Sequence, residues 1–179
     1  MTLRPDTKDW TWVLEHPCAE CGFDAAATAP AEVAGLLRGS SAGFVTALSA
    51  PGSGERTHAD HWSVLEYSCH VRDVHRVFAA RVHSMLAEDV PEFANWDQDA
   101  TAVSDAYHLQ DPITVAAELA EAGEAVAAVY AGVRADQWDR RGLRSNGSEF
   151  TVATIAVYHL HDVLHHVWDV TGTRASADG

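Results

Sequence analysis

The stretch SVLEYSCHVRDVHRVFAARVHSM, residues 63–85, decides the fold class. Ser63 and Glu66 match a capping box, in which the serine hydroxyl accepts the backbone N–H of Glu66 and the carboxylate accepts that of Ser63. Apolar residues then recur three and four positions apart, which is the spacing of one face of an α-helix. The stretch therefore predicts a long helix whose apolar face packs against other helices. That face consists of Val64, Tyr67, Val71, Val74, Phe78, Val82 and Met85.

Three further segments predict helices, and no strand-like alternation competes with them. They cover about residues 30–48, 111–133 and 151–172. Pro112 follows an aspartate cap at the first helical position, and Gly172 is a good left-handed residue beyond a helix end. The connection 87–110 can travel the length of a bundle, because an extended chain covers roughly 3.3 Å per residue. We therefore expect an all-α four-helix bundle with a long crossover between parallel second and third helices.

The domain organisation follows from the same segments. Residues 1–29 are expected to pack on the bundle, residues 30–172 to form it, and residues 173–179 to fray. Within the first helix, Gly35, Gly39 and Gly43 recur every four residues. This smooth stripe predicts close approach of another helix.

Charge and composition exclude several classes of function. Acidic residues outnumber basic ones 26 to 12, giving a formal net charge of −14. This charge opposes binding to nucleic acid or an anionic membrane, so a small-molecule substrate is expected. No apolar run has membrane-spanning length and the N-terminus has no apolar signal core, which predicts a cytoplasmic protein. A homodimer is one expected assembly. Three cysteines are too few, and an odd number, for a disulfide framework.

The sequence HLHDVLHH, residues 159–166, concentrates four histidines. Residues four apart share a helical face, so His161 and His165 align at the edge of the buried face. His159 and His166 are expected on the polar side. A pair spaced as HxxxH can offer two imidazoles to one metal. Taken alone, the HxxxH spacing favours core-edge histidines that are satisfied by hydrogen bonds over metal ligands.

His70 lies at the border of the apolar face of the second helix, in line with Glu66 and Asp73. Three neutral imidazoles from His70, His161 and His165 would fit Zn²⁺ or another divalent metal and leave positions open for water or substrate. Asp73 could orient His70 or act as a base; the alternative is a solvated surface charge.

The segments WSVLEYSCHVRDV (62–74) and YHLHDVLHHVWDV (158–170) together resemble the DinB/YfiT-like superfamily of metal-binding four-helix-bundle proteins. The resemblance implies a divalent metal at one end of the bundle, held by His70, His161 and His165. Zn²⁺ is the first choice of metal, with Ni²⁺ and Fe²⁺ as alternatives. Several members of the superfamily use a low-molecular-weight thiol cosubstrate, such as mycothiol or bacillithiol, as S-transferases or isomerases.

The chemistry expected from such a site is activation of a thiol for transfer to an electrophilic small molecule. Asp73 or Glu66 is the expected catalytic base, and Trp96 and Tyr107, on the long connection, are expected to hold the bound cosubstrate or acceptor. The connections 87–110 and 134–150 could wall a pocket or simply pack. The alternative function is a non-catalytic metal-binding or small-ligand-binding protein on the same bundle.

The N-terminal segment carries Cys18-x-x-Cys21, which lies outside the pattern of the superfamily. It resembles half of a zinc ribbon, to which His16 could add a ligand, but no second CxxC follows. A redox pair is a further interpretation, although its usual βαβ context is missing. We favour a packed turn with the cysteines as small apolar residues. A lid over the metal end is the remaining alternative.

Overall fold

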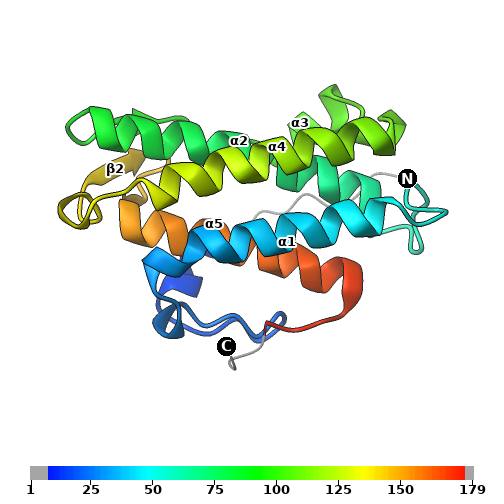
Figure 1. The fold of residues 1–179 in the computed structure, drawn as a ribbon, viewed down its shortest axis with the longest axis horizontal. Helices are drawn as coiled ribbons and strands as arrows, with labels where there is room; N and C mark the ends of the chain where they lie inside the picture. The colour runs from blue at the N-terminus through cyan, green and yellow to red at the C-terminus, as the bar shows by residue number, and fades with distance from the viewer. Residues whose placement is uncertain (1–7, 176–179) are drawn as a thin grey trace.

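The computed structural model describes residues 8–175 and contains four long helices. These are α1 (Val33–Leu48), α2 (Val64–Ala87), α4 (Pro112–Ala131) and α5 (Val152–Thr171). Both α4 and α5 pack against α1 and α2. α2 and α4 run in the same direction, opposite to α1 and α5 (Figure 1). The expected four-helix bundle with a long crossover is therefore confirmed.

The helix ends follow from the local sequence signals. Ser63 Oγ accepts the Glu66 backbone N–H at 3.2 Å, and the Glu66 carboxylate accepts the Ser63 N–H at 2.9 Å. Asp111 caps α4 through the backbone N–H of Thr114 at 2.8 Å. Gly172 ends α5 with a φ of +69°. The first helix differs slightly from expectation, because residues 30–32 form a 3₁₀ turn, η3 (Pro30–Glu32), before α1 begins.

A small sheet, not predicted from the sequence, holds the two long connections together. Its strands are β1 (Glu92–Phe93), β2 (Arg141–Arg144) and β3 (Glu149–Thr151), in the order β1-β2-β3. β1 pairs with β2 in parallel, and β2 with β3 in antiparallel. The first connection also contains α3 (Gln98–Ser104) and the 3₁₀ turn η4 (Tyr107–Leu109), and the second contains η5 (Ala135–Gln137). Both connections are thereby fixed beside the start of α5.

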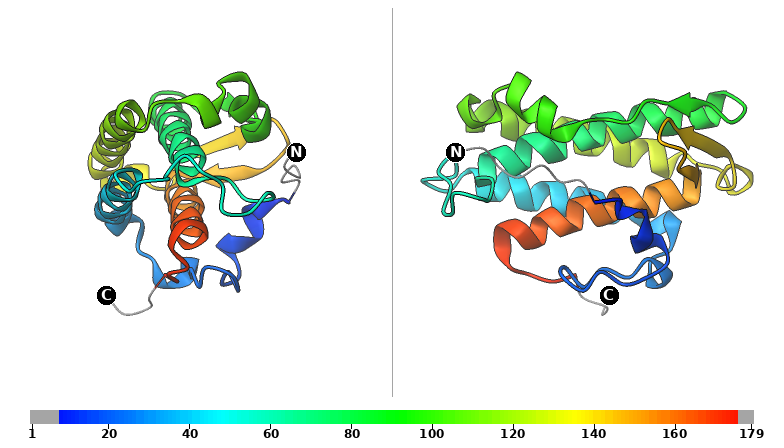
Figure 2. Two further views of the ribbon diagram at one scale, coloured as in Figure 1. Left: turned by 90° about the vertical axis from the view of Figure 1, so that its right-hand side faces the viewer. Right: turned by 180° about the vertical axis from the view of Figure 1, so that it is seen from behind.

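The N-terminal segment packs along α5 (Figure 2). Its 3₁₀ turns are η1 (Trp10–Leu14) and η2 (Ala25–Ala27). Val13 and Phe23 are buried in the main core. At the other terminus, the Arg174 side chain donates to the carbonyl of Ala19 at 3.0 Å, and the Ala175 N–H donates to that of Cys21 at 2.8 Å.

Residues 174 and 175, within the segment that is expected to fray, contact the N-terminal segment in this way. Residues 1–7 and 176–179 of the expected terminal segments lie outside the described part of the chain. Among residues 8–175, no helix combines the length and apolar character needed to cross a membrane.

The close helix approach expected at the glycine stripe of α1 occurs elsewhere. A Cβ added at Gly35, Gly39 or Gly43 would meet nothing within 4 Å. A Cβ at Gly123 of α4 would lie 2.4 Å from Ser41 Oγ and 2.9 Å from Ser41 Cβ. The expectation for the stripe is therefore wrong, and Gly123 is the small residue that lets α1 and α4 approach closely.

A buried chain of hydrogen bonds joins all four long helices. Ser41 Oγ donates to the carbonyl of Leu37, so it accepts from His75 Nε2 at 3.0 Å. His75 Nδ1 then accepts from His159 Nε2 at 3.0 Å, and Tyr130 donates its hydroxyl to His159 Nδ1 at 3.1 Å. His159 is fully buried, which corrects its expected place on the polar side. Each donor in the chain meets one acceptor, so both imidazoles are neutral.

Candidate metal centre

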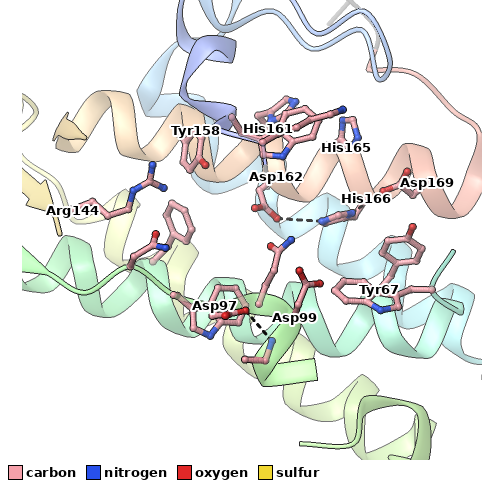
Figure 3. A pocket seen from close by; sticks show the side chains of 18 of the residues that line it. Tyr67, Asp97, Asp99, Arg144, Tyr158, His161, Asp162, His165, His166 and Asp169 are labelled. Carbon is pink, nitrogen blue, oxygen red and sulfur yellow. Dashed lines mark hydrogen bonds and ion pairs between the residues drawn. The ribbon is translucent and has the colours of Figure 1, made fainter. Parts of the chain in front are cut away.

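A cavity of about 620 Å³ lies between α2, α5 and the connection from α2 to α4 (Figure 3). Residues 95–100 of that connection and Arg144 of β2 contribute walls, so both connections wall the cavity, as one interpretation of the sequence suggested. The N-terminal segment adds Lys8 and Trp10. The N-terminal segment, α2, both long connections and α5 therefore all contribute to this cavity.

One group of metal-binding side chains consists of His70, Asp162 and His166; Asp162 and His166 line the cavity, as do His161 and His165, whereas His70 is fully buried. Asp162 Oδ1 lies 3.3 Å from His70 Nε2 and 3.6 Å from His166 Nε2. The three donor atoms all lie within 4.8 Å of one another. His166 Nδ1 lies 2.8 Å from Asp169 Oδ2, a carboxylate contact that commonly orients a metal-binding imidazole. We call this group the His–Asp–His triad.

The protonation states of the triad suit a metal. Burial lowers the pKa of His70, which is completely buried, so its imidazole is neutral at neutral pH. Burial opposes the charge of Asp162, but the hydrogen bond from His70 together with the electrostatic effect of the surrounding histidines holds the pKa of Asp162 well below its ordinary value. Metals bind neutral imidazole and ionised carboxylate. Two imidazoles and one carboxylate are the donor set of open-sided zinc and non-haem iron sites, so the residues present fit the metal that the sequence predicted.

A second group lies where α5 meets the N-terminal segment. It consists of Cys18, Cys21, His161 and His165, all buried, with donor atoms within 4.8 Å of one another. Cys18 Sγ is 3.7 Å from His165 Nδ1. Burial raises the pKa of the Cys21 thiol to about 12. This disfavours the reactive thiolate that a redox pair needs. His16, the expected further ligand, is exposed and does not belong to this group.

The structure therefore does not bring the predicted ligands His70, His161 and His165 together. His70 belongs to the triad, whereas His161 and His165 belong to the group with the cysteines. Successive helical residues are rotated by about 100°, so the row 161/165 faces the N-terminal segment while the row 162/166 faces α2. Sequence reasoning missed Asp162 and His166, although their spacing of four was the available signal.

The predicted catalytic acids have structural partners. Asp73 accepts from Arg72 at 2.9 Å and from the Tyr107 hydroxyl at 2.6 Å. Glu66 accepts from Arg56 at 2.8 Å in addition to its capping contacts. Neither acid lines the cavity, and neither does Tyr107, which is buried. Their predicted roles at a substrate therefore stay without geometric support.

Trp96, by contrast, lines the cavity and stacks on the His70 ring, with centroids 5.5 Å apart and planes 13° from parallel. The end of the cavity away from the triad is cationic: Figure 3 shows Arg144 far from His166. Arg81 also lines the cavity, and burial, with the nearby charge of Arg144, lowers the pKa of Arg81 to about 10. A pKa of about 10 leaves the Arg81 guanidinium charged at neutral pH, so this end suits an anionic group.

Comparisons with known proteins agree with this architecture. The sequence pattern of the DinB superfamily matches residues 27–170. A solved structure, described as "YfiT from Bacillus subtilis is a probable metal-dependent hydrolase with an unusual four-helix bundle topology", superposes with a TM-score of 0.70. The match has 18% sequence identity and covers 80% of this chain and 84% of the other. At that identity it supports the fold. Comparison with curated proteins gave no match.

Proposed function

The chain belongs to the DinB superfamily, and on that premise we propose that it is a metal-dependent enzyme that activates a low-molecular-weight thiol for transfer to an electrophilic small molecule. The observation that carries the proposal is the position of the His–Asp–His triad, two of whose members, Asp162 and His166, line a cavity of about 620 Å³. That volume lies within the range of small-molecule sites, roughly 300–1,000 Å³. Three protein donors leave coordination positions open toward the cavity.

A divalent metal bound by the triad supplies the positive charge that lowers the pKa of a thiol and makes its thiolate available at neutral pH. The surrounding residues position the donors. Asp169 orients His166 through its Nδ1 contact, and Trp96 fixes the plane of the His70 ring. These contacts hold both imidazoles in place before a metal or substrate arrives.

The far end of the cavity supports a role in substrate binding. Arg81 and Arg144 both line it, and Arg144 also packs its guanidinium near the Tyr158 ring at 5.9 Å. Guanidinium groups bind carboxylates in a fixed, forked geometry. We therefore expect the thiol or the acceptor to carry a carboxylate that binds at this end, which aims the reacting atoms at the triad.

Hydrolysis is the second candidate activity. Two histidines and one carboxylate hold zinc in known hydrolytic sites, and water would then take the place of the thiol. The Bacillus subtilis protein with a similar fold is described as a probable metal-dependent hydrolase. A non-catalytic metal-binding or small-ligand-binding protein remains the alternative of a different class.

The test is turnover by zinc-loaded protein. Loss of thiol is followed with mycothiol, bacillithiol or cysteine and a generic aryl halide acceptor; ester hydrolysis is followed in parallel without thiol. We expect thiol consumption that requires metal, is lost in His166→Ala and Asp162→Asn, and persists in His83→Ala, a matched variant at an exposed histidine of α2. Ester hydrolysis without thiol consumption would favour the second candidate. Metal binding without either reaction would favour the alternative of a non-catalytic binding protein.

A further inference from the structure

We propose that the chain binds a second divalent metal ion, of the zinc type, in a closed four-ligand site formed by Cys18, Cys21, His161 and His165, and that this ion fastens the N-terminal segment to α5. The site is separate from the His–Asp–His triad and plays no part in the proposed reaction. Its ligands come from two parts of the chain that are 147 residues apart at Cys18 and His165.

The distances within this group suit tetrahedral zinc. Zinc–sulfur bonds of about 2.3 Å and zinc–nitrogen bonds of about 2.0–2.1 Å, at tetrahedral angles, place the two donor atoms about 3.6 Å apart. Cys18 Sγ and His165 Nδ1 are 3.7 Å apart. All four donor atoms lie within 4.8 Å of one another, so small movements of side chains bring them to bonding distance of one ion.

An imidazole nitrogen of His161 without a hydrogen-bond partner supports a bound metal ion at this group. His161 is 3% exposed, and its Nε2 has no hydrogen-bond partner among the described residues. A buried polar atom without a partner loses its hydration without compensation, so native structures rarely leave one. His165 complements it, because Nδ1 faces Cys18 while Nε2 lies 3.3 Å from the Glu20 carboxylate. An outer carboxylate on the second nitrogen is typical of metal-binding histidine.

The loop that carries the cysteines is built to place both thiols on one side. The Cys18 N–H donates to the carbonyl of Phe23 at 2.8 Å, and the Gly22 N–H donates to that of Cys18 at 2.9 Å. Gly22 has a φ of +79°, which a residue with a side chain rarely adopts. A Cβ there would also lie 3.3 Å from the carbonyl oxygen of Ala175. The sequence C-x-x-C-G therefore forms a turn that places the two thiols side by side.

Burial decides what kind of site this is. Cys18 and Cys21 are 2% and 0% exposed, and both histidines are buried. Four protein ligands complete a tetrahedral zinc shell and leave no position for water or substrate, which is the arrangement of structural zinc. A redox-active pair instead needs an accessible thiolate, which this burial does not provide. The closed shell therefore favours a role in holding the fold together.

The consequence for the molecule is the placement of the cavity wall. Trp10 lines the cavity, and its ring centroid lies 5.5 Å from that of His161 and 4.9 Å from that of His165. The metal would hold Cys18 and Cys21 on α5, and with them the segment that brings Trp10 to the cavity. Loss of this ion should release the N-terminal segment while the bundle stays folded.

The test compares the wild type with Cys18→Ser/Cys21→Ser and with Cys69→Ser, a buried free thiol of α2 outside both groups. Each protein is loaded with Co²⁺ without added thiol. We expect a sulfur-to-cobalt charge-transfer band in the wild type and in Cys69→Ser, and none in the double variant. His166→Ala should keep the band, which separates failure of this proposal from failure of the proposed function.

Two measurements on the wild type guard against a variant that fails to fold. X-ray absorption at the zinc edge should detect sulfur scatterers, and chelation should open residues 8–29 to protease before the bundle is cut. The proposal is overturned if metal-saturated wild type shows neither sulfur scatterers nor the charge-transfer band. A Cys18–Cys21 disulfide in protein purified without oxidant would overturn it equally.

Discussion

His165 and His166 are consecutive residues of α5, yet their imidazoles serve different groups. His165 Nδ1 lies 3.7 Å from Cys18 Sγ, whereas His166 Nε2 lies 3.6 Å from Asp162 Oδ1. One step along a helix turns a side chain by about 100°, enough to give neighbouring side chains different partners. α5 thus presents two rows of donors with the same spacing of four residues, one toward the N-terminal segment and one toward α2.

The separation of the rows predicts separable losses of metal. His166→Ala removes a triad donor, and His165→Ala removes a donor of the cysteine group, so each should lower zinc content by one ion per chain. Only His165→Ala should expose residues 8–29 to protease. Native mass spectrometry and limited proteolysis measure the two effects. Loss of both ions in either variant would mean that the groups form one site.

Two glycine-to-alanine substitutions should change the free energy of unfolding in opposite directions. Gly123→Ala places a Cβ 2.4 Å from Ser41 Oγ, and such overpacking should lower the free energy of unfolding by about 1–3 kcal/mol. Gly39→Ala meets nothing within 4 Å in the interior of α1, and should raise it by about 0.5–1 kcal/mol. Urea denaturation of both variants measures the difference. Equal effects would contradict the packing of α1 on α4.

His75 predicts a loss of stability in acid. Burial lowers the pKa of His75 to about 4, whereas in the unfolded chain it is about 6.5. As pH falls from 6.5 to 4, the unfolded chain takes up a proton that the folded chain does not, so stability falls by up to about 1.4 kcal/mol per pH unit. Urea denaturation at several pH values should give a shallower decline for His75→Gln than for the wild type.

The same variant has a cost at neutral pH. His75→Gln replaces the imidazole acceptor of the His159 Nε2–H with a flexible amide, which should weaken this hydrogen bond and lower the free energy of unfolding by about 0.5–1.5 kcal/mol at pH 7. Parallel pH profiles for the wild type and the variant would contradict the neutral, buried state of His75.

Arg144 predicts an effect on substrate binding rather than on metal. Arg144→Gln removes a positive charge from the cavity, and loss of a charged hydrogen bond of about 1.5–3 kcal/mol should raise KM for an anionic substrate roughly 10- to 100-fold. Zinc content should stay unchanged. The matched control is Arg141→Gln, whose exposed side chain pairs with Glu149 on the same sheet. An unchanged KM in Arg144→Gln would remove the carboxylate from the proposed substrate.

The helices could be predicted because their signals are local. The Ser63–Glu66 capping box and the Asp111 cap act over three residues, and both are present. The sheet could not, because its strands of two to four residues are stabilised by pairing between distant connections. Likewise, helical spacing places His161 and His165 in one row but does not identify the partner that the row meets.

The two groups of ligands could not be predicted without knowing which segments pack against α5. Cys18 and His165 are 147 residues apart, and only the packing of the N-terminal segment on α5 brings them together. In the sequence, C-x-x-C and HxxxH are separate motifs, and neither one alone indicates that the two meet in the fold. The sequence alone does not show that Asp162 faces His70, because their contact joins α5 to α2 across the bundle.

The central claim is that α5 carries two metal-binding groups. Anomalous diffraction from crystals of the zinc-loaded protein, measured above and below the zinc absorption edge, tests it most directly. We expect two peaks in each chain, one among Cys18, Cys21, His161 and His165 and the other among His70, Asp162 and His166. A single peak bound jointly by His70, His161 and His165 would contradict it.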